Sequence, residues 1–303
     1  MMKRQQIIFI TTAALAVILL YAFGPTTKEQ PADTAATTHS PDDGHDHSAD
    51  ANAKGALDFT TMLGIAKQKL KPEQLKRVME LENSVVRGDV KQQQIHAFHM
   101  LARFWKDSAG IFVPYAKYTA EAAKLENSEK SLTFAAHLLL TELQGVEELP
   151  LQVWMAKEAR TLFEKAYESN PENDSTAVGL GSCYFFGAVN PGEMPMKGIN
   201  LIREVTNKNP DNAYAHYMLG MGAFISAQWP KAVERFSRVV ELEPNNMEAL
   251  LRLADAAERT GDKAAAKKWF IRFTQTVQRL EKEGKFRSNP DMIQRIEDHI
   301  KTL

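Results

Sequence analysis

Apolar residues return at helical spacing in one stretch after another of this chain. The clearest stretch is 213–246, AYAHYMLGMGAFISAQWPKAVERFSRVVELEPNN. Leu219 belongs to a first predicted helix and Ala232 and Phe236 to a second, which ends before Pro244 because proline cannot continue a helix. The stretch therefore predicts one helical hairpin.

The same markers recur at a fixed distance on both sides of this hairpin. Downstream counterparts lie 34 residues later, and upstream counterparts of the second helix lie 34 residues earlier. The upstream first helix lies 39 residues earlier, so the five extra residues fall in a loop around 189–193. The downstream markers are Leu253, Ala266 and Phe270; the upstream ones are Leu180, Gly181, Gly198, Ile202 and Pro210, with Ala159, Phe163, Ala166 and Pro171 marking one more second helix.

Small and aromatic residues hold constant places in these copies. Small residues at Gly220, Ala232 and Ala266 allow two helices to approach closely, while Phe236 and Phe270 fill the space between hairpins. No such unit buries its apolar face alone, so neighbouring units must stack. An ordinary helical bundle needs no constant offset, and the repeat therefore favours a solenoid.

The markers and their spacing resemble the tetratricopeptide repeat (TPR) family over about residues 90–283. The resemblance implies an all-α solenoid of helical hairpins wound as a right-handed superhelix. Within the repeat region, 90–287, clear units are expected at about 174–212, 213–246 and 247–283, with degenerate ones before.

Further helices are expected on both flanks. Residues 56–89 predict an amino-terminal helical hairpin, which Pro72 divides. The pattern then predicts helices over about 90–106, 113–125 and 129–143. Residues 288–303 predict a terminal capping helix with its apolar residues on one side: Met292, Ile293, Ile296, Ile300 and Leu303.

The amino terminus predicts a membrane anchor. After a short start, residues 1–6, an apolar run spans 7–23, at the short end of a transmembrane helix. Large residues at Tyr21 and Phe23 disfavour signal cleavage. Lys3 and Arg4 precede the run, so the positive-inside rule keeps the amino terminus in the cytoplasm and exports the rest.

Residues 24–55 change to a composition rich in Pro, Thr, Ala, Asp and His without apolar periodicity, which predicts a disordered acidic linker. His39, His45 and His47 stand there among aspartates and are weak candidates for a metal site. A solvated tether with incidental histidines is the favoured interpretation, because a disordered segment has no preset ligand geometry.

Charge and candidate chemistry narrow the function. The net charge of -1 disfavours nucleic-acid binding, and the single cysteine, Cys183, is expected in the core. His96 and His99 are three residues apart on one predicted helix and do not form a metalloprotease motif. No catalytic constellation or cofactor motif is present in the sequence, so an enzyme is not expected.

The resemblance also implies a binding groove, because TPR proteins line their concave face with first-helix side chains. An aromatic groove suits a peptide with apolar anchors. The same residues also fit burial against neighbouring helices, and the sequence leaves both interpretations open. The groove residues implied are Tyr214, Tyr217, Met221, Phe224 and Ile225, with Val178, Phe185 and Phe186 before them and Leu251, Asp255, Glu258 and Arg259 after them.

These expectations combine into one hypothesis: a membrane-anchored TPR scaffold or adaptor that binds other proteins or peptides at the periplasmic face of the inner membrane. Its layout is similar to TPR proteins of envelope protein assembly and maturation. The alternative is a self-assembling structural protein of the cell envelope, a homo-oligomer in which the groove or cap packs on a second copy.

Overall fold

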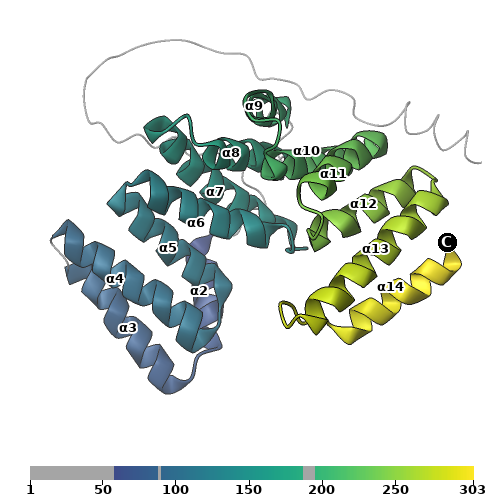
Figure 1. The fold of residues 1–303 in the computed structure, drawn as a ribbon. Helices are drawn as coiled ribbons and strands as arrows, with labels where there is room; N and C mark the ends of the chain where they lie inside the picture. The colour runs from purple at the N-terminus through teal and green to yellow at the C-terminus, as the bar shows by residue number, and fades with distance from the viewer. Residues whose placement is uncertain (1–57, 88–89, 187–194) are drawn as a thin grey trace, which may run out of the picture. The chain divides into compact units, whose positions relative to one another are not determined.

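The computed structural model describes residues 58–87, 90–186 and 195–303, and in these ranges every regular element is a helix (Figure 1). The chain divides into two units, Met1–Ala51 and Asn52–Leu303, and all described helices belong to the second. The expected anchor, 7–23, and the linker histidines lie outside the described residues. Among those described, no helix is both long and apolar enough to cross a membrane.

The helices follow one another as antiparallel hairpins (Figure 1). Each hairpin packs against the next one along the chain. The pairs are α4 (Lys91–Arg103) with α5 (Phe112–Glu126), α6 (Glu129–Leu143) with α7 (Leu149–Ser169), α8 (Asp174–Phe186) with α9 (Pro195–Lys208), α10 (Ala213–Ile225) with α11 (Trp229–Leu242), and α12 (Met247–Arg259) with α13 (Lys263–Lys282).

Asparagine caps start the first helix of three successive hairpins. Asn212 Oδ1 accepts a hydrogen bond from the backbone N–H of Ala215 at 2.9 Å, and Asn246 Oδ1 accepts one from Ala249 at the same distance. Asn173 caps α8 in the same way. Each cap satisfies a backbone donor that the first turn leaves unpaired, so the caps fix where these helices begin.

Glycines set the closest approach between paired helices. A Cβ on Gly198 of α9 would lie 2.1 Å from the carbonyl oxygen of Gly181 on α8. A Cβ on Gly220 would lie 2.7 Å from the ring of Phe236, so the expected close approach at Gly220 is confirmed. The small residue and the aromatic ring form one packing unit within the hairpin.

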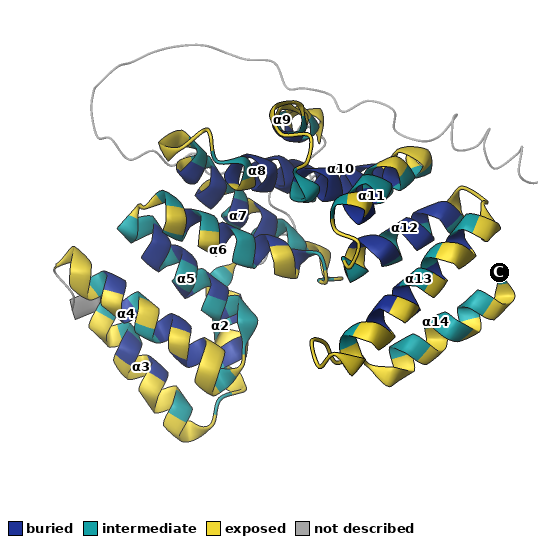
Figure 2. Ribbon diagram, viewed as in Figure 1, coloured by how far each residue is buried: buried dark blue, intermediate teal, exposed yellow. Residues whose placement is uncertain are grey.

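The core runs through the middle hairpins, and Figure 2 shows α8 and α10 buried along most of their length. The ring of Phe236 is fully buried, and so is that of Phe163. Cys183 is also buried, as expected, and burial raises the pKa of its thiol. α8 and α10 have neighbours on several sides, so their apolar residues are spread around the helix and do not form a single stripe.

The flanking helices cover the ends of this core. α2 (Phe59–Gln68) packs on α5, while α3 (Pro72–Arg87) packs on α4 and on a π-helical turn, η1 (Phe104–Ala109). At the other end α14 (Pro290–Thr302) packs on α13. Its five expected apolar residues are half-buried against the cores of the last two hairpins, and its outer side is exposed.

Candidate functional site

The first helices of the middle hairpins share a hollow of about 510 Å³. We call it the central hollow. Side chains from α6, α8 and α10 line it, together with residues at the α11–α12 turn and the start of α12. Its lining is His137, Leu140, Thr141, Gln144, Ser175, Ala213, Tyr214, Tyr217, Met218, Glu243, Asn246 and Glu248.

His137 stands at the centre of a ring of contacts in the central hollow. Its Nε2 lies 2.8 Å from the Ser175 hydroxyl, and its ring meets Phe163 and Tyr214 edge to face, with centroids 4.9 and 5.7 Å apart. Burial lowers the pKa of His137, because the charged form loses its hydration. The imidazole is therefore neutral at pH 7 and offers a polar but uncharged edge.

The two tyrosines on α10 are the predicted groove residues that line the central hollow. The Tyr217 hydroxyl donates a hydrogen bond to Glu248 Oε1 at 2.6 Å. Burial, and secondly Glu248, raise the pKa of Tyr217, so this hydroxyl keeps its proton. Tyr214 is half-buried and burial raises the pKa of its hydroxyl as well.

The other predicted groove residues separate into different environments. Met221 and Phe185 are buried, with exposed fractions of 5% and 8%, and Val178 is fully buried. The reason is that α8 and α10 are covered on several sides, so first-helix side chains reach the core as well as the groove. Phe186 and Leu251 are half-buried against the core, and the 52% exposed Ile225 lies outside the central hollow.

Phe224 and Arg259, both predicted groove residues, come together at the end of α10. The Arg259 guanidinium lies 5.6 Å from the Phe224 ring centroid and 4.9 Å from that of Trp229. Phe224 and Trp229 meet edge to face at 5.1 Å, and Arg252 also lies over Phe224. This cluster joins α10, α11 and α12 by cation–π contacts and half buries Phe224.

The charged residues expected at the carboxy-terminal end of the groove partly face α14. Glu258 Oε2 lies 2.8 Å from His299 Nε2, so one of these charged residues already contacts the capping helix α14. Asp255 is half-buried, and burial raises the pKa of its carboxyl group. These residues therefore belong to the contact between α12 and the cap.

The sequence analysis named only Tyr214 and Tyr217 of the twelve residues that line the central hollow, and it missed the whole contribution of α6, its C-cap and α8: His137, Leu140, Thr141, Gln144 and Ser175. The first three lie on α6, whose register the repeat markers did not fix. The Asn173 cap lies 39 residues before the Asn212 cap, as Leu180 lies before Leu219, so it supports the register that the markers had already given α8. α6 carries no such marker, and its part in the hollow could not be found from the repeat spacing.

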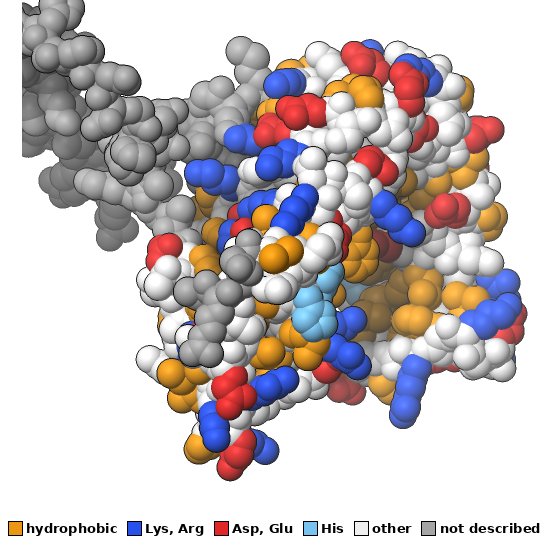
Figure 3. Space-filling model, turned by 90° about the vertical axis from the view of Figure 1, so that its left-hand side faces the viewer, with side chains coloured by type: hydrophobic (Ala, Val, Ile, Leu, Met, Phe, Trp, Pro, Cys, Tyr) orange, Lys and Arg blue, Asp and Glu red, His pale blue; other side chains and the backbone are white. Residues whose placement is uncertain are grey.

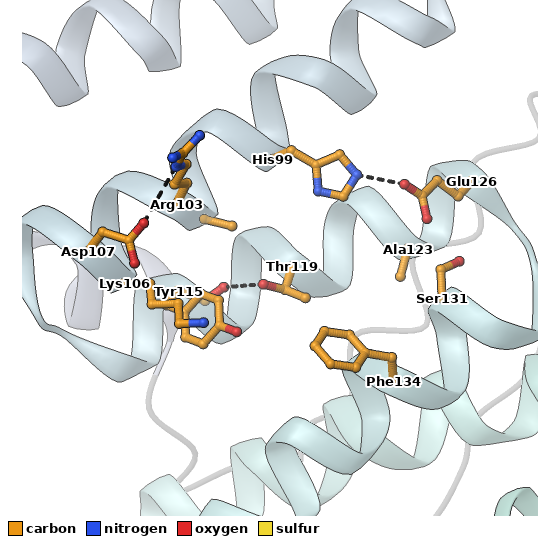
Figure 4. Close-up of a pocket in the computed structure, with 11 residues that line it drawn as sticks. His99, Arg103, Lys106, Asp107, Tyr115, Thr119, Ala123, Glu126, Ser131 and Phe134 are labelled. Carbon is orange, nitrogen blue, oxygen red and sulfur yellow. Dashed lines mark hydrogen bonds and ion pairs between the residues drawn. The ribbon is translucent and has the colours of Figure 1, made fainter.

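A second hollow of about 290 Å³ lies between α4, η1, α5 and α6 (Figure 4). Its polar side chains are paired with one another: His99 Nε2 lies 2.6 Å from Glu126 Oε1, and Arg103 bonds to Asp107. Phe134 lines it with 60% of its surface exposed. His99 and His96 are thus both exposed surface residues of α4.

The space-filling view shows where apolar surface reaches the solvent on one side of the molecule (Figure 3). Hydrophobic side chains gather there in a hollowed area, with lysine and arginine side chains at its edge. Within the part of the chain that the structure describes, no group of three or more His, Cys, Asp or Glu residues is placed to hold a metal ion. The candidate metal ligands His39, His45 and His47 fall outside that part.

Part of this chain matches a known protein family. A family model described as tetratricopeptide repeat matches residues 217–272. The match covers α11 and α12, most of α10 and the first half of α13, the hairpins in which the sequence markers are clearest. No curated protein matches this chain.

Several solved structures resemble the chain, with TM-scores below 0.5. A crystal structure of MamA is 15% identical, covers 65% of this chain and 98% of its own, and has a TM-score of 0.43. MamA from Desulfovibrio magneticus RS-1 is 20% identical, with coverages of 65% and 97% and a TM-score of 0.40. YrrB, described as a TPR protein with an unusual peptide-binding site, is 15% identical, with coverages of 65% and 91% and a TM-score of 0.39.

Proposed function

We propose that this protein is a TPR scaffold that binds a segment of another protein in the central hollow. The observation that carries the proposal is the composition of the hollow: an apolar and aromatic floor with a few convergent polar groups. That combination is typical of sites that recognise peptides and small ligands. The tetratricopeptide repeats at residues 217–272 support a protein-binding role in place of a catalytic one.

We further propose that the chain acts at the periplasmic face of the inner membrane, in envelope protein assembly or maturation. The support is in the sequence alone: the apolar run 7–23, the preceding Lys3 and Arg4, and the acidic segment 24–55. In this proposal the anchor keeps a bound partner near the bilayer.

Self-assembly into a structural homo-oligomer is the second candidate function. The exposed ring of Phe134 beside the hollow of Figure 4 favours it, because a large apolar side chain with 60% of its surface exposed is a plausible contact for a second copy. The two candidates differ in the surface that makes the contact: the central hollow for a partner segment, and the surface around Phe134 for a second copy.

Photo-crosslinking in cells tests the proposed function. A photo-reactive amino acid replaces Thr141, an exposed residue of α6 that lines the central hollow. The matched control position is Thr161, exposed on α7 and absent from that lining. We expect adducts with a distinct envelope protein from position 141 only. Adducts of the chain with itself indicate self-assembly, and equal capture from both positions contradicts the proposal.

A further inference from the structure

The central hollow is rich in hydrogen-bond acceptors and in negative charge. Glu243 and Glu248 both line it, at the α11–α12 turn and the first turn of α12. Among its described lining residues there is no lysine or arginine. His137 is the one basic side chain in the lining, and burial lowers its pKa so that it stays neutral at pH 7. The fixed charge of the lining is therefore negative.

The carboxylates retain capacity to accept further hydrogen bonds. Glu248 Oε1 accepts the Tyr217 hydroxyl, and Glu243 Oε2 accepts the Asn246 side-chain amide at 2.8 Å. A carboxylate has about four lone-pair sites, so one neutral donor leaves most of them open. Both glutamates are exposed and available to a bound segment.

Gln144, the residue that follows α6, also lines the central hollow. Its Oε1 is shielded from solvent and has no hydrogen-bond partner in the described part of the chain, so this atom is not open to a bound segment as it stands. The accessible carboxylates of the hollow are therefore Glu243 and Glu248, on the α11–α12 side.

The floor beside these carboxylates suits an aliphatic stem. Leu140, Ala213 and Met218 line it with the rings of Tyr214 and Tyr217. Long basic side chains lay their methylene groups on such surfaces and extend their charged heads to polar groups. Arg252 of α12 lies over the Phe224 ring, 5.8 Å from its centroid, and it also interacts with the side chain of Tyr217 beside the hollow.

We infer that the segment bound in the central hollow presents a lysine or arginine side chain, with its stem on the tyrosine floor and its charged head toward Glu243 and Glu248. The inference rests on the proposed function, because it names the chemistry of the partner segment that the hollow takes. The lining carries two carboxylates and no lysine or arginine, and Arg252 beside Tyr217 offsets only one of these two charges, so the hollow selects a basic segment over an acidic one.

The test selects peptides on the full-length chain in detergent micelles from a phage-displayed library of random dodecapeptides. One enriched peptide is then synthesised with its basic residue intact and with that residue replaced by glutamine. Binding is measured by fluorescence anisotropy to the wild type, to Glu243→Gln/Glu248→Gln, and to the charge-matched control Glu80→Gln/Glu283→Gln. Glu80 and Glu283 are exposed residues of α3 and the end of α13 that do not line the central hollow.

We expect enrichment of lysine and arginine over aspartate and glutamate. We also expect binding about tenfold weaker for the hollow variant and for the glutamine peptide, as the loss of one charge-assisted contact predicts. The control variant keeps wild-type affinity. Peptides that bind the hollow without basic enrichment, or bind both double variants equally, overturn this inference and leave the proposed function standing. If no peptide is enriched on the wild type, both fail.

Discussion

At the scale of single residues, glycines that leave no room for a methyl group set the spacing between paired helices. The expectation that Gly220 and Ala232 allow close approach came from the repeat markers, and the Phe236 ring against Gly220 confirms its physical basis. The backbone contact between Gly181 and Gly198 could not be predicted from the sequence. Only the structure shows that a Cβ on Gly198 would collide with the Gly181 carbonyl oxygen.

Replacing Gly198 with alanine should destabilise the α8–α9 hairpin. The new Cβ would lie 2.1 Å from the Gly181 carbonyl oxygen, so the helices must separate, at a cost of ~1 to 3 kcal/mol in the free energy of unfolding. Gly64→Ala on α2 is the control: its Cβ would meet open space, and better helix propensity should add ~0.5 to 1 kcal/mol. Urea denaturation of both variants measures the two effects. Equal stabilities would contradict the close contact.

His137 should make stability depend on pH. Its pKa in the folded state is lowered, so the unfolded chain binds the proton more readily. The contribution of the neutral ring is complete above the ordinary histidine pKa of ~6.5 and is lost as the pH falls below it. Thermal melts between pH ~7.5 and ~5 should therefore show a larger fall for wild type than for His137→Gln.

The control for the pH dependence is His96→Gln, a change at an exposed position on α4. Its melting temperature should fall with pH as that of the wild type does. A fall of the same size in His137→Gln would show that the buried ring does not control the dependence.

At the scale of helices, the sequence predicted the elements well and their exposed faces poorly. The helix expected over 129–143 is α6, because a regular apolar pattern follows the Ser128 cap. Within α10, Tyr217 and Met221 are both buried in the core, but only Tyr217 also lines the hollow, because neighbours surround that helix. Helical spacing names the positions that share a face, but packing decides which face stays open.

Removing a repeat-spaced cap should weaken the helix that it starts. In Asn246→Ala the backbone N–H of Ala249 loses its acceptor at the start of α12, at a cost of ~1 kcal/mol in the free energy of unfolding. Asn207→Ala, at an exposed position inside α9, should stay within ~0.5 kcal/mol of wild type. Chemical denaturation compares them, and similar values for the two variants would argue against a capping role.

Truncation of one side chain on α14 should show that this helix closes the solenoid. Ile296 is half-buried against the cores of both carboxy-terminal hairpins. Ile296→Ala should cost ~1 to 2 kcal/mol, roughly half the value for a fully buried site. Ile65→Ala, at a half-exposed position on α2, should change the stability by less than ~0.5 kcal/mol. An Ile296→Ala variant as stable as the Ile65→Ala variant would mean that α14 is not part of the packed core.

At the scale of the whole molecule, the central hollow assembles residues about a hundred positions apart in sequence. Thr141 of α6 and Glu248 of α12 line it together because the intervening hairpins return each first helix to the same side. The repeat spacing predicted that such a shared surface exists. It did not predict the share of α6, whose sequence lacks the markers, nor the division of the aromatic residues between hollow and core. The proposed anchor and linker remain predictions from composition.

Filling the hollow tests the central claim most directly. Thr141→Trp places a large ring in the central hollow from an exposed position, whereas Thr161→Trp adds the same ring on α7 outside it. The measurement is the affinity of a peptide selected on the wild-type chain, by fluorescence anisotropy. The account predicts that Thr141→Trp weakens binding by about tenfold or more, equivalent to ~1.4 kcal/mol, and that Thr161→Trp leaves it unchanged. Unchanged binding to Thr141→Trp would place the binding function on another surface of the molecule.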